Sequence, residues 1–255
     1  MFQRTVPVSF RSEIARGIFV VRFQSHEIAS SAVAGQFVNI RCGDGCLPLL
    51  RRPMSISMIV GDEVELLFNV VGQGTRILAA KRPGDILDVL GPLGVPFGYR
   101  GDYSTAVIVA GGVGVAPFPF LTASLTHEGK KIVSFLGART AAHLAPQHLE
   151  NVQLATDDGT NGHHGTVVEL LEGYLRRHQL PRPKIFGCGP TNMLKALSDF
   201  ARKEGIDCEL SLEGDMACGL GICQGCPVER TDGRKKYALV CVEGPTFNSK
   251  DIILR

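Results

Sequence analysis

The chain lacks a strong excess of charge of either sign. Lys and Arg number 27, Asp and Glu number 25, the formal net charge is +2, and the basic residues form no polybasic tract. Because a nucleic-acid surface needs clustered Lys and Arg, we expect no nucleic-acid partner. With 44% hydrophobic and 20% charged residues over 255 positions, the chain can bury the core of one large domain or two smaller ones.

The sequence also lacks an uninterrupted apolar segment of membrane-spanning length. The first residues, MFQRTVPVSF, have no apolar core of the kind found in signal peptides. The apolar run 105–125 is broken by glycines and prolines, so we expect a buried strand, a tight loop and a helix there. We therefore expect no membrane association and a cytoplasmic location, where structural disulfides are uncommon.

Four cysteines near the end of the chain have the spacing of a metal cluster. They are Cys218, Cys223, Cys226 and Cys241. The pattern C-x4-C-x2-C followed by a distant Cys is typical of plant-type [2Fe–2S] sites. The glycines between them permit positive φ and a close approach of backbone N–H groups to sulfur; these are Gly219, Gly221 and Gly225. Structural zinc is the alternative, although zinc sites usually show two short Cys pairs.

Other cysteines and histidines carry weaker signals. Cys42, Cys46 and Cys208 are expected to be small buried or loop residues. The pair His163–His164 lies in a glycine-rich segment with no third ligand apparent, so we expect a solvated turn there.

The first hundred residues resemble a β-domain with a site for a phosphate-bearing cofactor. Segments 35–42 and 62–71 are strand-like and separated by turn residues. Between them, Arg52 and Ser55 interrupt an apolar stretch; Arg can hold a pyrophosphate and a Ser hydroxyl can donate to a flavin ring. Gly72, Gly74 and Thr75 predict a glycine turn that opens a helix and presents backbone N–H groups to a phosphate. An exposed basic strand end and an ordinary turn are the alternative.

From about residue 103 the pattern changes to alternating strands and helices, among them an expected strand at 131–139 and an amphipathic helix at 165–178. This predicts a parallel α/β domain with ligands at the carboxyl ends of its strands. The glycine loop 112–117 departs from the dinucleotide fingerprint G-x-G-x-x-G, because Pro117 stands in place of the third glycine. Arg139 follows a strand at the position where an Arg can accommodate a 2′-phosphate.

Taken in order, RRPMS, GQGT, GGVGVAP, FGCGP and the cysteine cluster resemble the ferredoxin-reductase superfamily. Within it, the sequence is most similar to electron-transfer subunits of NAD-linked (type 1B) dihydroorotate dehydrogenases, over essentially the whole chain. The resemblance implies an α/β plus β fold of three units. They are an FAD-binding β-barrel at 1–100, an NAD-binding parallel α/β domain at 101–211 and a small [2Fe–2S] domain at 212–255.

The resemblance also implies the roles of individual residues. The residues implied at FAD are Arg52, Pro53, Met54, Ser55, Asn69, Val70, Val71, Gly74 and Thr75. Those implied around the nicotinamide are Gly112, Gly114, Pro117, Asp157 and Cys188. The four cysteines named above would ligate the cluster.

The implied function is electron transfer in pyrimidine biosynthesis. A partner subunit containing FMN would oxidise dihydroorotate, and electrons would pass through the cluster and FAD to NAD+. The family assembly is a heterotetramer of two copies of each chain, and we expect the loop 219–227 to face the partner. The alternatives are a flavin and iron–sulfur subunit of another NAD(P)H reductase, of the ferredoxin:NADP oxidoreductase or sulfhydrogenase type, and a zinc-stapled binding module without flavin.

Overall fold

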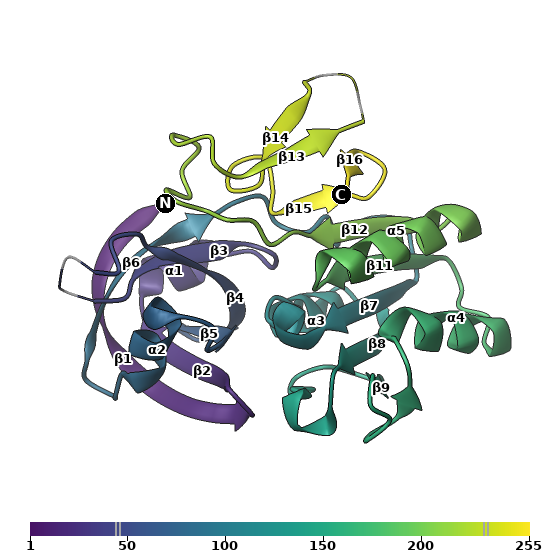
Figure 1. Ribbon diagram of the computed structural model, residues 1–255, viewed down its shortest axis with the longest axis horizontal. Coiled ribbons are helices and arrows are strands. Elements are labelled where there is room, and N and C mark those ends of the chain that lie inside the picture. The colour runs from purple at the N-terminus through teal and green to yellow at the C-terminus, as the bar shows by residue number, and fades with distance from the viewer. Residues whose placement is uncertain (44, 46, 232, 234) are drawn as a thin grey trace.

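The computed structural model describes residues 1–255 apart from 44, 46, 232 and 234, so Cys46 lies outside the described residues. A barrel from the N-terminal part of the chain stands beside a sheet layered with helices, and the C-terminal segment lies across the top of both (Figure 1). The barrel and the helix-layered parallel sheet confirm the predicted fold class. The domain boundaries remain predictions.

The N-terminal unit is a closed antiparallel barrel with the strand order β1-β2-β5-β4-β3-β6. Side chains that alternate along each strand fill it, as Val38 and Ile40 of β3 do. Two helices pack Ile28 and Leu78 against this core. The elements are β1 (Phe2–Ala15), β2 (Ile18–Gln24), α1 (His26–Ser31), β3 (Phe37–Arg41), β4 (Arg52–Val60), β5 (Glu63–Asn69), α2 (Gln73–Ala80) and β6 (Ile86–Leu93).

The second unit is a seven-stranded sheet in the order β10-β9-β8-β7-β11-β12-β15. Every neighbouring pair is parallel except β12 with β15. Its elements are β7 (Thr105–Gly111), η1 (Gly112–Val115), α3 (Phe118–His127), β8 (Lys131–Ala138), η2 (Ala141–His143), β9 (Val152–Thr156), β10 (His163–His164), α4 (Val167–Arg177), β11 (Pro183–Cys188), α5 (Thr191–Glu204), β12 (Asp207–Ser211) and β15 (Thr246–Asn248).

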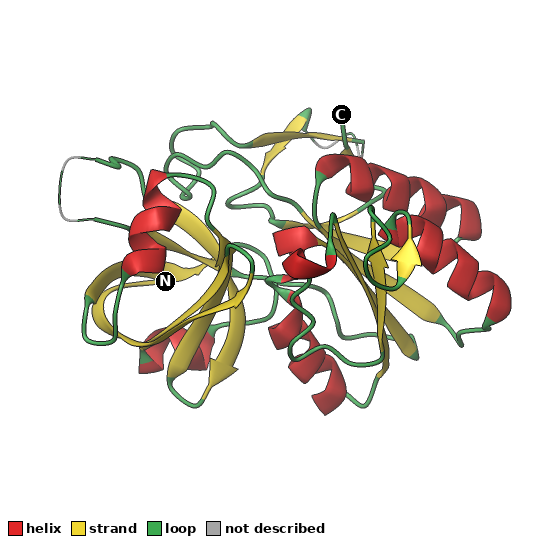
Figure 2. Cartoon of the chain, turned by 60° about the horizontal axis from the view of Figure 1, so that its bottom comes forward, coloured by secondary structure: helices red, strands yellow, loops and turns green. Residues whose placement is uncertain are grey.

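Helices cover both faces of this sheet (Figure 2). On one face α3 packs Phe118 into a core that it shares with Ile18 of the barrel, so α3 joins the two units. On the other face α4 and α5 bury Leu171 and Leu197. Strand residues alternate between the two cores, which is the pattern expected of a sheet buried on both sides.

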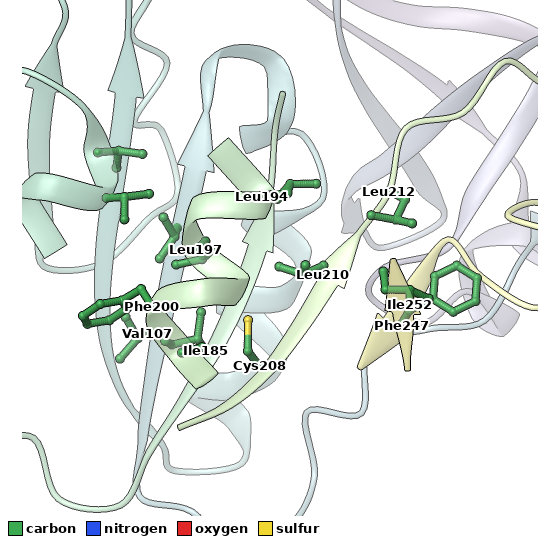
Figure 3. Close-up of a cluster of buried hydrophobic side chains, with 14 of the residues drawn as sticks. Val107, Ile185, Leu194, Leu197, Phe200, Cys208, Leu210, Leu212, Phe247 and Ile252 are labelled. Atoms are coloured by element: carbon green, nitrogen blue, oxygen red, sulfur yellow. The ribbon is translucent and has the colours of Figure 1, made fainter. Parts of the chain in front are cut away.

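The C-terminal segment adds a small sheet and one strand of the larger sheet. β14 (Tyr237–Leu239), β13 (Pro227–Arg230) and β16 (Ile252–Ile253) pair in that order. β15 pairs with β12, and Phe247 and Ile252 lie beside Leu210 and Leu212 in one apolar cluster (Figure 3). The end of the chain is therefore fixed to the α/β unit by both backbone pairing and side-chain burial.

One sequence expectation about local structure was wrong. His163 and His164 do not form a turn but the two-residue strand β10, which pairs with Ala155 and Thr156 of β9 while both side chains stay exposed. Backbone pairing along the free edge of β9 decided the conformation, and the side chains gave no signal for it. None of the helices in the described chain combines the length and apolar character needed to cross a membrane.

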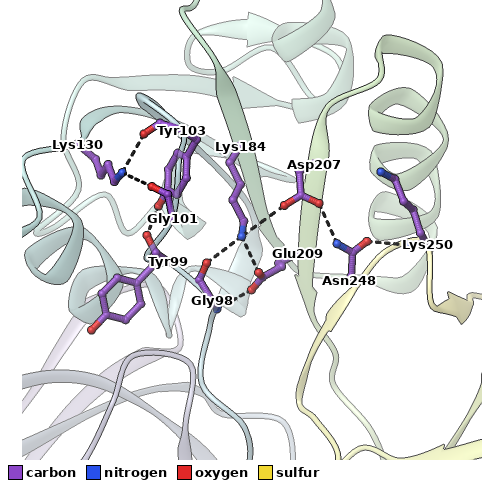
Figure 4. A network of polar contacts seen from close by, with 10 residues as sticks. All are labelled: Gly98, Tyr99, Gly101, Tyr103, Lys130, Lys184, Asp207, Glu209, Asn248 and Lys250. Atoms are coloured by element: carbon purple, nitrogen blue, oxygen red, sulfur yellow. Dashed lines mark hydrogen bonds and ion pairs between the residues drawn. The ribbon is translucent and has the colours of Figure 1, made fainter.

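A buried ion-pair network holds the segment between the two units (Figure 4). Lys184 Nζ lies 2.7 Å from Glu209 Oε1 and donates to the carbonyl of Gly98 at 2.8 Å. The N–H of Gly98 donates to Glu209 Oε2, and Asn248 of β15 donates to Asp207 of β12, each at 2.8 Å. The network therefore connects the segment between the two units to β11, β12 and β15 at the amino ends of the parallel strands.

Candidate functional site

A cavity of about 310 Å³ opens between the barrel and the α/β unit. The sequence-predicted residues that line it are Arg52, Pro53, Met54, Ser55, Asn69, Val71, Thr75, Pro117 and Cys188. The first seven, which were predicted for FAD, come from β4, the end of β5 and the turn into α2. Pro117 and Cys188 were predicted at the nicotinamide, and the structure places them on the opposite wall of this cavity.

Local packing explains the glycine turn before α2. A Cβ on Gly74 would lie 2.9 Å from Arg52 Nε, so the helix start lies directly against the guanidinium. Thr75 Oγ1 accepts the backbone N–H groups of Val71 and Gly72 at 3.0 and 3.1 Å, which closes the turn. A cation beside a helix N-terminus suits a pyrophosphate, so these residues fit FAD. Two residues predicted at FAD, Val70 and Gly74, are not among the residues that line this cavity.

A second cavity, of about 560 Å³, lies at the carboxyl ends of β7, β8, β9 and β11. Of the predicted nicotinamide residues, Gly112 and Asp157 line it, and Asn69 lines both cavities. Gly114 instead packs beneath the loop, because its Cβ would lie 2.4 Å from the carbonyl oxygen of Cys188. The two cavities are neighbours because they share Asn69. The glycine loop 112–117 packs against the end of β11.

The second cavity carries charge of both signs. Arg139 and His143 line it together with the carboxylate of Asp157. The neighbouring Asp158 is turned to Thr160 and accepts its N–H and its hydroxyl at 3.0 and 2.6 Å. Arg139 thus gives this cavity a guanidinium group, which can pair with a phosphate.

The C-terminal cysteines differ in environment. Sγ of Cys226 and Sγ of Cys241 are buried and lie 3.3 Å apart. Sγ of Cys218 accepts the backbone N–H groups of Cys223 and Leu220 at 3.4 and 3.3 Å, and these bonds lower its pKa to about 6. Burial, together with the neighbouring Cys226, raises the pKa of Cys241 to about 12. Metal binding would therefore release a proton from Cys241.

The thiols fit an iron–sulfur cluster in their chemistry. N–H groups directed at sulfur stabilise metal-bound thiolates. Gly219 and Gly221 adopt φ of +69° and +79°, as predicted; Gly225 has no positive φ, and its Cβ would lie 3.4 Å from Sγ of Cys223. Among the described residues, no three His, Cys, Asp or Glu side chains lie close enough together to hold a metal ion in this structure.

Sequence reasoning missed Glu213 and Asn39. Glu213 lines both cavities just after β12, and desolvation raises the pKa of its carboxyl. The rule that placed Asp157 at a strand end could have found it. Asn39 donates to the carbonyl oxygen of Cys218 at 3.0 Å from the barrel strand β3. No sequence signal links two residues so far apart in the chain.

Comparison with known proteins shows where such an arrangement occurs. Residues 213–253 match the family model for the iron–sulfur cluster binding domain of dihydroorotate dehydrogenase B. The dihydroorotate dehydrogenase B (NAD+) electron transfer subunit of Desulforamulus reducens is 37% identical over 94% of this chain and 94% of its own. The subunit of the same name from Bacillus velezensis is 36% identical over 97% of each chain.

Solved structures agree with this fold. The structure of an NADH-dependent reduced ferredoxin-NADP oxidoreductase has a TM-score of 0.87 and 28% identity, covering 98% of this chain and 90% of the other. A ferredoxin NADP+ reductase from Neisseria gonorrhoeae has a TM-score of 0.67 at 16% identity, covering 80% of this chain and 92% of that one, and shows the fold alone.

These comparisons confirm the predicted family, and they confirm an NAD-linked oxidoreductase subunit that transfers electrons and acts with a catalytic partner subunit. They also support the expected cofactors: FAD, an iron–sulfur cluster and NAD. The chain belongs to the family of dihydroorotate dehydrogenase B (NAD+) electron transfer subunits.

Proposed function

We propose that this chain carries electrons from an FMN-containing dihydroorotate dehydrogenase subunit, through a [2Fe–2S] cluster and FAD, to NAD+ in pyrimidine biosynthesis. The observation that supports this best is spatial. The cavity with Arg52 and the α2 N-terminus adjoins the cavity with Gly112 and Asp157, and the region after β12 leads directly from both to the four cysteines. One chain thus offers sites for two-electron and one-electron carriers side by side.

The electron balance explains why both kinds of carrier are needed. Oxidation of dihydroorotate to orotate releases two electrons and two protons, and NAD+ takes two electrons and one proton as a hydride. A [2Fe–2S] centre passes one electron at a time, whereas a flavin exchanges electrons singly or as a pair. The flavin site must therefore lie between the cysteines and the nicotinamide site.

The residue roles in this proposal follow the geometry. Arg52 and the α2 N-terminus would hold the FAD pyrophosphate, and Ser55 in the same cavity would donate to the flavin ring. Gly112 and Asp157 receive the nicotinamide cofactor in the second cavity. Ligation of the cluster falls to the four C-terminal cysteines. Pro117 and Cys188, on the α/β side of the same cavity, would contact the bound FAD.

The partner docks at the cluster loop in this proposal. Ile222 is 79% exposed and Leu220 36% exposed, and Val242, which contacts the Gly221 position, is 48% exposed. Exposed apolar side chains grouped beside redox thiols suit a protein contact that brings another redox centre close. We propose a cytoplasmic heterotetramer of two copies of each chain.

A second candidate is the flavin subunit of an NADP-linked reductase. The 28% identity to the NADH-dependent reduced ferredoxin-NADP oxidoreductase and the position of Arg139 favour it. The 37% identity to a dihydroorotate dehydrogenase B subunit over 94% of both chains ranks it second.

Cofactor analysis of anaerobically purified chain tests the proposal. We expect two irons, two labile sulfides and one FAD per chain, and faster bleaching of the flavin by NADH than by NADPH. Stoichiometric zinc without labile sulfide would contradict the cluster. A preference for NADPH would favour the second candidate and make Arg139 a phosphate ligand.

A further inference from the structure

Asn39 is a buried amide at the junction of the barrel and the cysteine region. It lies on β3 and is 1% exposed. Its neighbour Val38 points into the barrel core, whereas Phe37, two residues before Asn39, packs in the same apolar cluster as Cys226 and Cys241. Because alternate strand residues share a face, Asn39 lies on the outer face of the barrel, which the cysteine region covers.

The amide contacts the first cysteine of the cluster pattern. Asn39 Nδ2 donates to the carbonyl oxygen of Cys218 at 3.0 Å. This bond also fixes the orientation of the amide, since a carbonyl can only accept. The next residue, Gly219, has φ of +69°, and its Cβ would lie 2.0 Å from Asn39 Nδ2. The cysteine loop therefore lies so close to the amide that only glycine fits.

The amide oxygen of Asn39 differs from the nitrogen in its hydrogen bonding. Asn39 Oδ1 is buried and has no hydrogen-bond partner among the described residues. A buried acceptor without a partner destabilises a fold, so an apolar side chain of similar size would suit this place if stability were the only demand. The Nδ2 group is therefore the part of the amide that makes a hydrogen bond, and of the four cysteines it contacts Cys218.

The same strand leads directly to the flavin cavity. Asn39 is paired with Pro53 of β4, the strand that carries Arg52, Met54 and Ser55 along the cavity. Pro53, which lines the cavity proposed for FAD, is thus paired with Asn39, and Asn39 is hydrogen-bonded to the Cys218 backbone. We propose that Asn39 is a positioning residue that sets where the Cys218 ligand stands relative to the flavin, and so governs electron transfer between the cluster and FAD. This inference rests on the proposed function.

The test compares Asn39→Asp with wild type and with Ser57→Ala. Aspartate keeps the shape of the side chain, and in its ionised form, which alkaline pH favours, it has no donor and opposes the Cys218 carbonyl. Ser57 is a matched control, because it is also buried, its Oγ has no hydrogen-bond partner among the described residues, and it lines neither cavity. Three quantities are measured: FAD content, the rate at which NADH reduces the flavin, and the rate and low-temperature paramagnetic spectrum of cluster reduction.

We expect Asn39→Asp to retain FAD and its reduction by NADH, to change the cluster spectrum, and to slow electron transfer from flavin to cluster on the order of tenfold or more, since small misplacements of reacting groups have effects of this size. Complete loss of the cluster with FAD retained also supports the inference. Ser57→Ala should match wild type in all three quantities.

A second variant approaches the contact from the other side. Gly219→Ala should reproduce the effect, and Asn39→Ala with Gly219→Ala should be less impaired than the sum of the two, because the smaller side chain makes room for the added methyl. Additive effects would overturn the inference, as would an unchanged spectrum and transfer rate in Asn39→Asp, or loss of FAD together with the cluster. Absence of iron and labile sulfide from wild type would instead refute the proposed function.

Discussion

Arg51 and Arg52 are neighbours in sequence but lie in different environments. Arg51 pairs with Asp88 at 2.8 Å and bonds the backbone of β6, away from the cavity lining. Arg52 lines the cavity that we propose for FAD and lies against the start of α2. The sequence motif alone could not distinguish the structural arginine from the one available to a ligand.

The two arginines therefore give a matched pair of variants. Arg52→Ala should weaken FAD binding about ten- to hundredfold, because charge-assisted hydrogen bonds of about 1.5–3 kcal/mol are lost. Titration of the apoprotein with FAD measures this directly. Arg51→Ala should leave FAD affinity within about twofold of wild type; equal losses in both variants would mean that Arg52 is not the pyrophosphate ligand.

Gly114 does not line the 560 Å³ cavity, but its packing can affect the shape of that cavity. A methyl group at this position would lie 2.4 Å from the carbonyl oxygen of Cys188, a backbone atom that cannot swing away. Gly114→Ala should separate the glycine loop from β11 and raise the KM for NADH about tenfold, the effect of overpacking by about 1–3 kcal/mol. FAD content should be retained.

Gly173→Ala is the control, since Gly173 lies in α4 with nothing within 4 Å of the added Cβ. Steady-state reduction of an artificial dye by NADH gives the KM of each variant. An unchanged KM in Gly114→Ala would show that the contact with β11 does not shape the nicotinamide cavity.

At the scale of elements, Lys184 on β11 joins the linker to β12. Its side chain is 10% exposed and that of Glu209 is 15% exposed. Lys184→Met leaves Glu209 buried without its cation, so the free energy of unfolding should fall by about 3 kcal/mol. Chemical denaturation measures this loss, and FAD affinity should not change, because the network lies at the opposite ends of the strands from the cavities.

Arg202→Met supplies the contrast for Lys184→Met. Arg202 and Asp199 are paired but 69% and 61% exposed, so their loss should change the free energy of unfolding by less than about 0.5 kcal/mol. Equal effects from the two variants would mean that burial does not strengthen the Lys184 network.

Strand and helix patterns were readable from the sequence where periodicity is local. Segments such as 131–139 and 165–178 predicted β8 and α4, because buried runs and amphipathic spacing are properties of neighbouring residues. The sequence did not reveal that β15 enters the large sheet, or that Asn39 meets Cys218, because both contacts join distant segments whose side chains carry no mark of their partners.

The same distinction applies to the candidate site. Gly112 and Asp157 could be predicted because each directly follows a strand, whereas Arg52, the first residue of β4, was implied by the resemblance of RRPMS to the family motif. The position of Pro117 and Cys188 in the lining of the 310 Å³ cavity could not be predicted, since it depends on how the α/β unit packs against the barrel. Glu213 was missed although it also follows a strand end.

At the scale of the whole molecule, the barrel, the α/β unit and the C-terminal segment all contact one another. The barrel and the α/β unit share a core through α3, and the C-terminal segment contacts both through Asn39 and β15. In the proposed function, the cysteines receive electrons from the partner subunit and pass them to the cofactors in the two cavities. The exposed Ile222 and Val242 mark the side on which we place the partner.

The most direct test of this account is reconstitution with an FMN-containing dihydroorotate dehydrogenase subunit. Alone, the chain should reduce artificial dyes with NADH and leave dihydroorotate untouched; mixed with the partner, it should form one NADH per dihydroorotate oxidised. Cys223→Ser should keep the dye reaction and lose this coupling. Oxidation of dihydroorotate by the isolated chain, or a mixed complex that never reduces NAD+, would contradict the electron relay proposed for this chain.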